Sequence, residues 1–284
     1  MLTLPLSITG IVLLAALLHA IWNAFVKIGE DRLIVMAMFN ITGLIVGWAV
    51  IPFVGLPAPA AWPFIIASSV LHTGYYFFLI RAYDHGDLSQ IYPLARGASP
   101  ILIALGAAFA AGEWLNTQAA IGLGVACAGI ISLAFEKGLP WRHNTRAVLF
   151  ALGTSLFIAA YTLTDGTGVR VAGEPLAYIA WLVALDGIPL IIYTAWTRRT
   201  KLSTALHRHW RIGSAAGLAS TAAYGLVIWA MALAPMAMVS AVRETSVIFA
   251  ALIGAVVLRE RFGLVRGFAT ALVVAGVCML QLSA

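Results

Sequence analysis

Charged residues are scarce in this 284-residue chain. They make up 10% of it, hydrophobic residues make up 62%, and the mean hydropathy is +0.97. A soluble domain has about 25% charged residues, so too few are present here to cover a globule. This excludes a soluble enzyme, a disordered chain and a nucleic-acid-binding protein. The net charge of +6 does not indicate DNA binding, because the basic residues lie in short loops between apolar runs, as in membrane proteins.

Cysteine is also scarce. The only two, Cys127 and Cys278, lie inside apolar runs and belong to no CxxC or Cys/His spacing. We therefore expect two buried thiols that pack as small apolar side chains, with no metal site, disulfide framework or cofactor. The chain also lacks a GxxxxGK[ST] phosphate-binding loop, so it does not itself use ATP.

Ten apolar runs are long enough to cross a bilayer, because a helix needs about 20 mostly apolar residues to do so. They cover residues 5–27, 33–54, 60–83, 88–111, 117–135, 147–165, 175–197, 210–232, 236–258 and 263–282. No basic segment precedes the first run, so we expect a retained helix and not a cleaved signal. The predicted fold class is an all-α integral membrane protein with ten transmembrane helices.

Lys and Arg are distributed unequally between the two sets of loops. Counted together with the adjoining ends of the runs, the loops after odd-numbered runs carry 14 of them, the loops after even-numbered runs carry 1, and both tails carry none. Basic loops stay in the cytoplasm. The bias therefore predicts cytoplasmic odd loops and both termini on the outside. Two further basic residues, Arg96 and Arg243, lie in the interior of runs.

The chain matches itself without a gap at a shift of 147 residues, which indicates an internal repeat. The matched pairs include Arg96 with Arg243, Ser99 with Ser246, Glu113 with Glu260, and Gly129 with Gly276. We expect a first five-helix repeat over residues 1–137, a cytoplasmic linker over 138–146 and a second repeat over 147–284. Five is odd, so the second repeat must be inverted. Secondary transporters often have this design, with the substrate between the halves, and a channel could share it.

Two segments resemble a known family. Residues 110–129, where one helix ends in Glu113 and a Gly-rich helix follows, resemble the signature of the EamA domain in the drug/metabolite transporter (DMT) superfamily. Residues 258–267, around Glu260, resemble its second copy. The resemblance covers the whole chain as two five-helix units. It implies a basket in a bacterial inner (plasma) membrane, with periplasmic termini. The central cavity would be formed by helices 1, 3, 4, 6, 8 and 9.

Within that superfamily, His72 on the third helix and Tyr92-Pro93 on the fourth resemble the YddG-type exporters of aromatic amino acids. Those exporters tend to follow Tyr-Pro with Trp, whereas this chain has Leu94. The resemblance implies a cavity that binds an aromatic or other neutral amino acid.

Arg96 is a candidate for function because a charge at the centre of a bilayer costs about 2.5–3.5 kcal/mol on insertion scales. Its guanidinium either binds a substrate carboxylate in bidentate fashion or pairs with Glu244 or Asp186 to hold helices together. Arg243 occupies the matching place in the second half. Glu244 adjoins Arg243, but neighbouring side chains point apart on a helix, so we expect the two to have other partners.

The residues around Arg96 predict a broken helix. Pro93 and Pro100 flank Arg96, and proline removes a backbone donor and kinks a helix. Broken helices at half-depth line many transporter sites. In helical spacing Tyr92, Arg96 and Ser99 share one face.

His72 lies near the middle of the third run, close to Tyr75, Tyr76 and Tyr83. A membrane histidine usually makes hydrogen bonds between helices, and the alternatives are substrate contact and proton relay, since imidazole titrates near pH ~6.5. Buried tyrosines need hydroxyl partners, which favours a polar, wet cavity here.

Further aromatic residues lie where cavity helices should face each other: Trp22, Tyr161, Trp181 and Tyr224. They suit an aromatic or cationic solute, although Trp and Tyr also form interfacial belts.

The candidate proton carriers are His72, Asp186 and Glu244. We expect Glu113 and Glu260, at the ends of runs, to face water. The Gly-x3-Gly patterns and Gly122, Gly124 and Gly129 allow close helix approach.

The sequence therefore predicts a secondary transporter that works by alternating access, most concretely an exporter of aromatic or neutral amino acids. The alternatives are a DMT transporter of a phosphonate, a sugar phosphate, a nucleotide sugar or a cationic drug, and a channel. An intramembrane enzyme would need catalytic pairs within the spans, and Asp186 has no partner Asp inside a predicted run. The expected partners are a small-molecule substrate and the lipid bilayer, with no nucleic acid. We expect a monomer, with dimerisation through the fifth and tenth helices as the alternative.

Overall fold

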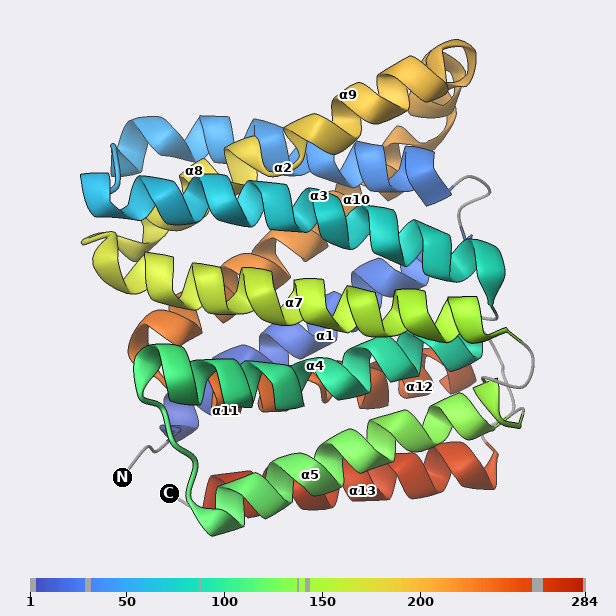
Figure 1. Cartoon of the computed structure of the whole chain (residues 1–284). Helices are drawn as coiled ribbons and strands as arrows, with labels where there is room; N and C mark the ends of the chain where they lie inside the picture. Colours follow the sequence, from blue (N-terminus) through green and yellow to red (C-terminus); the bar gives the residue numbers. More distant parts are fainter. Residues whose placement is uncertain are drawn as a thin grey trace.

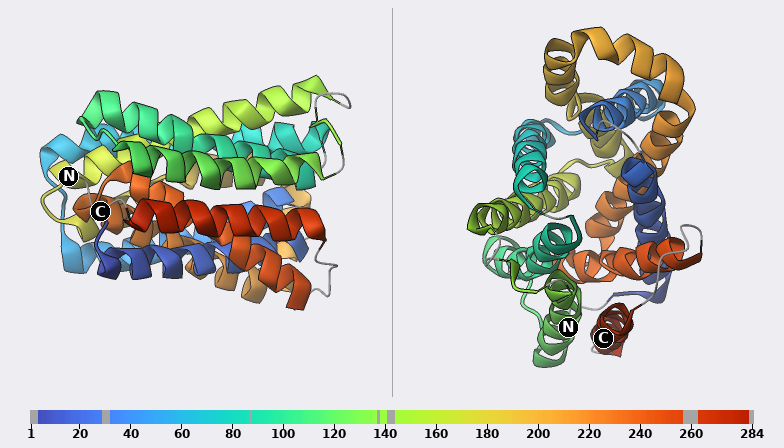
Figure 2. Two further views of the ribbon diagram at one scale, coloured as in Figure 1. Left: turned by 90° about the horizontal axis from the view of Figure 1, so that it is seen from below. Right: turned by 90° about the vertical axis from the view of Figure 1, so that its right-hand side faces the viewer.

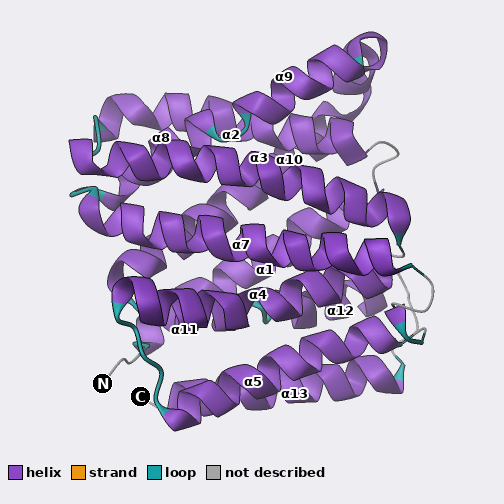
Figure 3. Cartoon of the chain, viewed as in Figure 1, coloured by secondary structure: helices purple, strands orange, loops and turns teal. Residues whose placement is uncertain are grey.

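The computed structural model describes residues 4–28, 32–86, 88–136, 138–140, 144–256 and 263–282, and within these ranges every regular element is helical (Figure 3). The first half contains α1 (Leu6–Ile28), α2 (Arg32–Val54), η1 (Pro59–Ala61), α3 (Trp62–His85), α4 (Leu88–Ala111), α5 (Thr117–Ser132) and η2 (Leu133–Phe135). The second half contains α7 (Thr145–Val171), α8 (Pro175–Leu185), α9 (Ile188–Thr197), α10 (Arg199–Leu233), α11 (Met236–Arg243), α12 (Ser246–Val256) and α13 (Leu264–Leu282).

Ten helical segments of the described chain are long and apolar enough to cross a membrane, which confirms the ten predicted spans. They cover Leu6–Phe25, Leu33–Val54, Pro59–His85, Gln90–Ala111, Thr117–Phe135, Thr145–Val171, Pro175–Thr197, Trp210–Leu233, Met236–Ile253 and Leu264–Leu282. The protein is therefore an all-α, multi-pass integral membrane protein. The sixth span runs six residues beyond its predicted end at position 165.

The interrupted helices are not where the prolines predict them. The fourth span is one continuous helix, α4, with Pro93 and Pro100 inside it. Pro100 cannot donate to the carbonyl of Arg96, but the Ser99 hydroxyl donates to that carbonyl at 3.1 Å, so the helix continues. The seventh span is interrupted instead between α8 and α9, and the ninth between α11 and α12.

The helices run roughly side by side, with both termini at the same end of the molecule (Figure 1). At the opposite end of the molecule lie the end of α3, the start of α7, the junction of α9 and α10 and the start of α13. These helix ends carry Arg81, Arg146, Arg198 and Arg266. Arg170, near the end of α7, is on the side of the termini. The sequence asymmetry thus corresponds to two differently charged ends, while the side that faces the cytoplasm stays a prediction.

Helices α5 and α13 form a pair at one edge of the bundle (Figure 2). They approach so closely that a Cβ on Gly122 would lie 2.8 Å from the carbonyl oxygen of Gly276. Gly129 likewise faces the backbone of Ala269 at 2.9 Å. These glycines are thus used for packing within the chain. Cys127 is buried on α5 as expected, but Cys278 is exposed on α13, because it lies on the face of that helix turned away from α5.

Glu113 is buried and does not face water, contrary to expectation, because it links three helices. Its carboxylate forms an ion pair with Arg170 of α7 and accepts a 2.7 Å hydrogen bond from the backbone N–H of Met236, at the start of α11. Arg170 also donates to the carbonyls of Met231 and Ala234, at the end of α10. The pair therefore satisfies both helix ends at the α10–α11 turn. Glu260 lies outside the described residues.

Replacing Gly122 by Ala should lower the melting temperature of the purified protein, because the added methyl would overlap the Gly276 backbone. Gly124 provides the matched control: it lies on the same helix, and a Cβ there meets nothing within 4 Å. Gly124→Ala should leave the melting temperature unchanged or raise it, because alanine stabilises a helix by up to about 1 kcal/mol relative to glycine. Equal effects of the two substitutions would contradict the close contact.

Replacing Glu113 by Ala should destabilise the protein by about 3 kcal/mol, because it leaves Arg170 and the start of α11 without their acceptor. Thermal unfolding in detergent measures this. Glu136→Ala is the control, since its 3.6 Å pair with Arg266 is partly exposed, and such pairs contribute less than about 1 kcal/mol. A loss for Glu113→Ala no larger than for the control would show that the link is not structural.

Candidate functional site

A central cavity of about 100 Å³ lies between the helices of the bundle. Its lining comes from α1, α2, α3, α4, α7, α8, α10 and α11, and from Asp186 between α8 and α9. All six helices that the family resemblance implied contribute to it. The second and seventh spans line it as well, because Asn40 of α2 and Asp186 also face the cavity.

One wall of the cavity is aromatic. His72 of α3 is stacked on Tyr161 of α7, with ring centroids 4.1 Å apart, and meets the edge of Tyr224 of α10 at 5.5 Å. The ring centroid of Tyr161 is also 5.7 Å from that of Tyr75, and the ring centroid of Tyr75 is 5.2 Å from that of Tyr76. These rings from three helices offer a surface on which a planar solute could pack.

His72 is oriented by its own helix. Its Nδ1 lies 2.9 Å from the carbonyl oxygen of Ser68 and 3.2 Å from the Ser68 hydroxyl. To bond to the carbonyl, Nδ1 must carry the hydrogen, so in the neutral ring Nε2 is an acceptor. The histidine is thus held within α3, while its ring face belongs to the aromatic wall.

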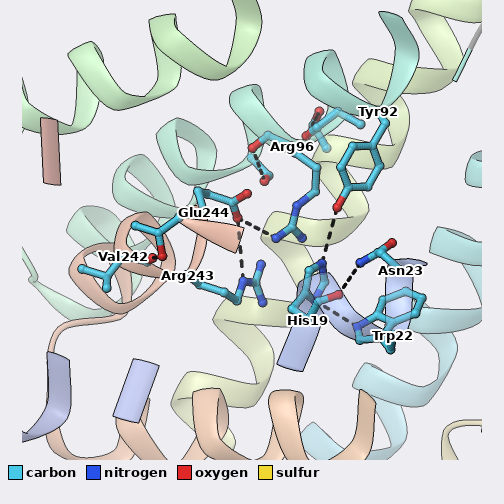
Figure 4. A network of polar contacts seen from close by, with 12 residues as sticks. His19, Trp22, Asn23, Tyr92, Arg96, Val242, Arg243 and Glu244 are labelled. Atoms are coloured by element: carbon cyan, nitrogen blue, oxygen red, sulfur yellow. Dashed lines mark hydrogen bonds and ion pairs between the residues drawn. The ribbon is translucent and has the colours of Figure 1, made fainter. Parts of the chain in front are cut away.

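A buried charge cluster lies beside the cavity (Figure 4). Nη2 of Arg96 is 2.9 Å from Oε1 of Glu244, and Nε of Arg243 is 3.7 Å from the same oxygen. The three side chains are 6% exposed or less. Arg96 therefore pairs with Glu244, one of the two readings open from the sequence. Both arginines also line the cavity.

Arg243 and Glu244 converge, contrary to the expectation for neighbours on a helix. The reason is that α11 ends at Arg243 and Glu244 is the residue that caps its end, with α12 beginning at Ser246. The interrupted backbone lets two consecutive side chains reach one place. Among the described residues, Arg96 Nε and Arg243 Nη2 have no hydrogen-bond partner, so the cluster offers buried donors to an anionic group.

His19 of α1 is a cavity residue that the sequence interpretation missed. It accepts a 3.2 Å hydrogen bond from Trp22 Nε1, its carbonyl accepts from Asn23 at 2.8 Å, and its Nε2 is 3.5 Å from the Tyr92 hydroxyl (Figure 4). The spacing of His19, Trp22 and Asn23 on one helical face could have revealed it.

Most of the predicted site residues meet at the cavity. Trp22, His72, Tyr75, Tyr76, Arg96, Tyr161, Asp186, Tyr224 and Arg243 line it. Tyr92 does not itself line the cavity, but its hydroxyl lies 3.5 Å from Nε2 of His19, which does. Ser99 and Pro93 are buried in α4, and the Ser99 hydroxyl bonds to its own helix. Glu244 lies behind the two arginines.

Trp181 is not in the cavity, contrary to prediction. Its Nε1 donates to the carbonyl of Gly55 at 2.9 Å, and its ring packs on Trp48 and Trp62 at 5.7 and 5.0 Å. The close approach of α8 to Gly47 of α2 orients the helix so that Val183 lines the cavity instead.

Asp165 is the second residue that sequence reasoning missed, because the predicted sixth run ended at it. In the structure α7 continues to Val171, so Asp165 lies inside a span. The expectation that Asp186 has no partner Asp inside a span did not take Asp165 into account. Asp165 accepts hydrogen bonds from the hydroxyls of Tyr178 and Tyr224. Among the described residues, no group of three or more His, Cys, Asp or Glu side chains could hold a metal ion.

Membrane transporters commonly hold their cargo in a polar cavity within a bundle of membrane-spanning helices. Residues 145–282 match the model of the EamA-like transporter family. A solved crystal structure shares the fold at a TM-score of 0.77, over 97% of this chain and 97% of its own, with 19% identity. No curated protein matches the chain. Residues 145–282 therefore form an EamA-like transporter domain, as the resemblance to the DMT superfamily implied, and the members of this family are membrane transporters of small molecules.

Replacing Glu244 by Gln should destabilise the protein by about 3 kcal/mol, because two buried guanidinium groups lose their carboxylate. In the double variant Arg96→Gln/Glu244→Gln, the loss should be smaller than the sum of the two single losses, since the residues are in contact. Thermal unfolding of the four proteins forms the cycle. Additive losses would contradict the ion pair.

Proposed function

We propose that this transporter exports aromatic or other neutral amino acids by alternating access. The observation that supports it best is the combination of unpaired guanidinium donors and an aromatic wall in one buried cavity. A free amino acid with a ring carries both complementary groups. The family supports transport of small molecules, and the cavity chemistry supports this cargo.

Each part of such a cargo has a partner of matching chemistry. The substrate carboxylate would accept from Arg243, whose Nη2 has no hydrogen-bond partner among the described residues. The ring would pack against Tyr161, Tyr224 and His72. The ammonium group would approach Asp186, which lines the cavity next to Asn40. The cargo would then be held at three points of different character.

The cavity is small for such a cargo. Its volume is about 100 Å³, whereas small-molecule sites span about 300–1,000 Å³. An aromatic amino acid therefore enters only when the lining helices separate. The two interruptions, at Asp186–Gly187 and Glu244–Thr245, adjoin the cavity and are suited to bend during this motion.

We further propose that residues 1–137 and 147–284 form inverted repeats, joined by the linker at 138–146. The basic helix ends, gathered at one end of the bundle, support an orientation in which that end is cytoplasmic and both termini are periplasmic. The membrane would be a bacterial inner membrane. The monomer is the proposed unit, because Gly122 and Gly276 already pack against each other.

An anionic cargo, such as a phosphonate or sugar phosphate, is the second candidate. The specific observation in its favour is that two arginines line the cavity and share one glutamate, Glu244. Arginine pairs bind phosphate and phosphonate groups through several parallel hydrogen bonds. Asp186 on the same cavity argues against a doubly charged anion, since its carboxylate would repel such a group.

Counterflow in proteoliposomes tests the cargo. Unlabelled phenylalanine is placed inside, labelled phenylalanine outside, and a panel of unlabelled competitors is added outside. We expect accumulation of label that aromatic and neutral amino acids inhibit, and that sugars and phosphates do not. Accumulation inhibited by phosphonates or sugar phosphates alone would favour the second candidate. No saturable exchange of phenylalanine would refute amino acid export.

Tyr161→Ala should raise the half-saturating phenylalanine concentration about tenfold, since a ring contact contributes roughly 1.4 kcal/mol. Tyr193→Ala is the matched control, because that tyrosine is 51% exposed on α9, away from the cavity lining. Equal kinetics for both variants would remove Tyr161 from the binding surface.

A further inference from the structure

A second polar cluster lies behind the aromatic wall, centred on Asp165 of α7. The residue is 0% exposed. Its Oδ1 accepts a hydrogen bond from the Tyr178 hydroxyl of α8 at 2.9 Å, and its Oδ2 accepts one from the Tyr224 hydroxyl of α10. The Ser68 hydroxyl of α3 also interacts favourably with this carboxylate. One carboxylate thus joins four helices from different parts of the chain.

This carboxylate differs from the other buried carboxylates that link helices. Glu113 and Glu244 have guanidinium partners, whereas no described basic side chain lies within ion-pair distance of Asp165. A buried carboxylate is costly as an ion when only neutral hydroxyls solvate it. A proton is the smallest ligand that removes the charge, and the carboxylate, at 0% exposed, presents no surface to a larger one.

Two short routes connect Asp165 to the cavity. Tyr224 lines the cavity with its ring and reaches Asp165 with its hydroxyl. The Ser68 hydroxyl interacts with Asp165 and lies 3.2 Å from Nδ1 of His72, which also lines the cavity. The same two rings, Tyr224 and His72, belong to the aromatic wall that would hold the cargo. A change in the protonation of Asp165 therefore acts directly on side chains that form the binding surface.

We propose that Asp165 is a proton-binding site that couples proton movement to cargo movement, an inference that rests on the transport function proposed above. The step transfers one proton from hydronium in the cavity water to a carboxylate oxygen, leaves water behind and breaks no covalent bond of the protein. Once neutral, the carboxyl group is a weaker acceptor for the Tyr224 hydroxyl, so protonation loosens a ring that the cargo contacts. By linkage, cargo binding changes proton binding by the same factor.

Other titratable and charged groups surround this cluster, and their geometry suits the role less well. Glu244 is already paired with two arginines. Asp186 faces the cavity itself, where the cargo would occupy it, and its charge repels that of Asp165. The groups that act on Asp165 or its partners are Tyr161 on α7, His72 on α3, Tyr178 on α8, Tyr224 on α10, Arg96 on α4 and Arg243 on α11.

Infrared difference spectroscopy tests proton binding without any cargo. The reconstituted wild-type protein is titrated from about pH 9 to about pH 5, a range that brackets the carboxyl groups of buried sites. We expect a carbonyl band of a protonated, buried carboxyl that is absent in Asp165→Asn. The control Asp84→Asn, an exposed carboxylate at the end of α3, should retain the band. A band that persists in Asp165→Asn, or no band in the wild type, overturns the proposal.

Asp165→Glu keeps the inference testable should Asp165→Asn fail to fold. Because glutamic acid retains a carboxyl group in a slightly different position, the titrating band should remain but change its frequency. A band with unchanged frequency would belong to another residue and would refute the assignment to Asp165.

Transport measurements then distinguish a failure of the proton coupling from a failure of the proposed cargo. In the wild type, a pH gradient across the proteoliposome should change the steady level of labelled phenylalanine, and this effect should be lost in Asp165→Asn while counterflow at equal pH persists. Wild-type counterflow that is insensitive to a pH gradient would overturn the coupling alone. Absence of phenylalanine counterflow would refute the proposed cargo, and the infrared result would still decide whether Asp165 binds a proton.

Discussion

The buried contact between Arg96, Glu244 and Arg243 constrains the centre of this protein. Three charges deep inside a membrane protein are tolerable only when they solvate one another, so α4 must meet the junction of α11 and α12 at one point. The ninth span has to be interrupted there, because an unbroken helix would direct Arg243 and Glu244 apart. Two guanidinium groups share one carboxylate, which leaves an excess of positive charge beside the cavity.

In the rest of the bundle, close backbone packing and looser side-chain packing lie in different regions. At the edge, α5 and α13 pack backbone against backbone through Gly122 and Gly276 and leave no space between them. In the centre, large side chains with hydroxyl or imidazole groups keep the helices apart and surround the cavity. At the end that holds the termini, Arg170 and Glu113 satisfy the ends of α10 and α11. A transporter that moves its helices around a central site needs both rigid pairs and a polar, deformable centre.

Two buried clusters of opposite character lie on either side of the same aromatic wall. The arginine cluster faces the cavity and suits an anionic group of the cargo. Asp165 lies behind Tyr224 and is surrounded by neutral donors. The separation allows a cargo and a proton to occupy the protein at different places while influencing each other through Tyr224 and His72. Such a shared wall is a physical basis for coupling two solutes without direct competition for one residue.

The sequence by itself determined the ten spans, the difference in charge between the two ends and the presence of Arg96, Arg243 and the tyrosines within the spans. These properties are local: mean hydropathy, loop composition and rare polar residues in apolar runs are visible without knowledge of neighbouring helices. The tertiary structure alone decided that Trp181 packs away from the cavity while Val183 lines it, that α4 continues through its prolines, and that Asp165 is deeply buried. The physical reason is that a helix that is apolar on all sides has no face marked in its sequence, so its rotation follows from packing against partners distant in the chain.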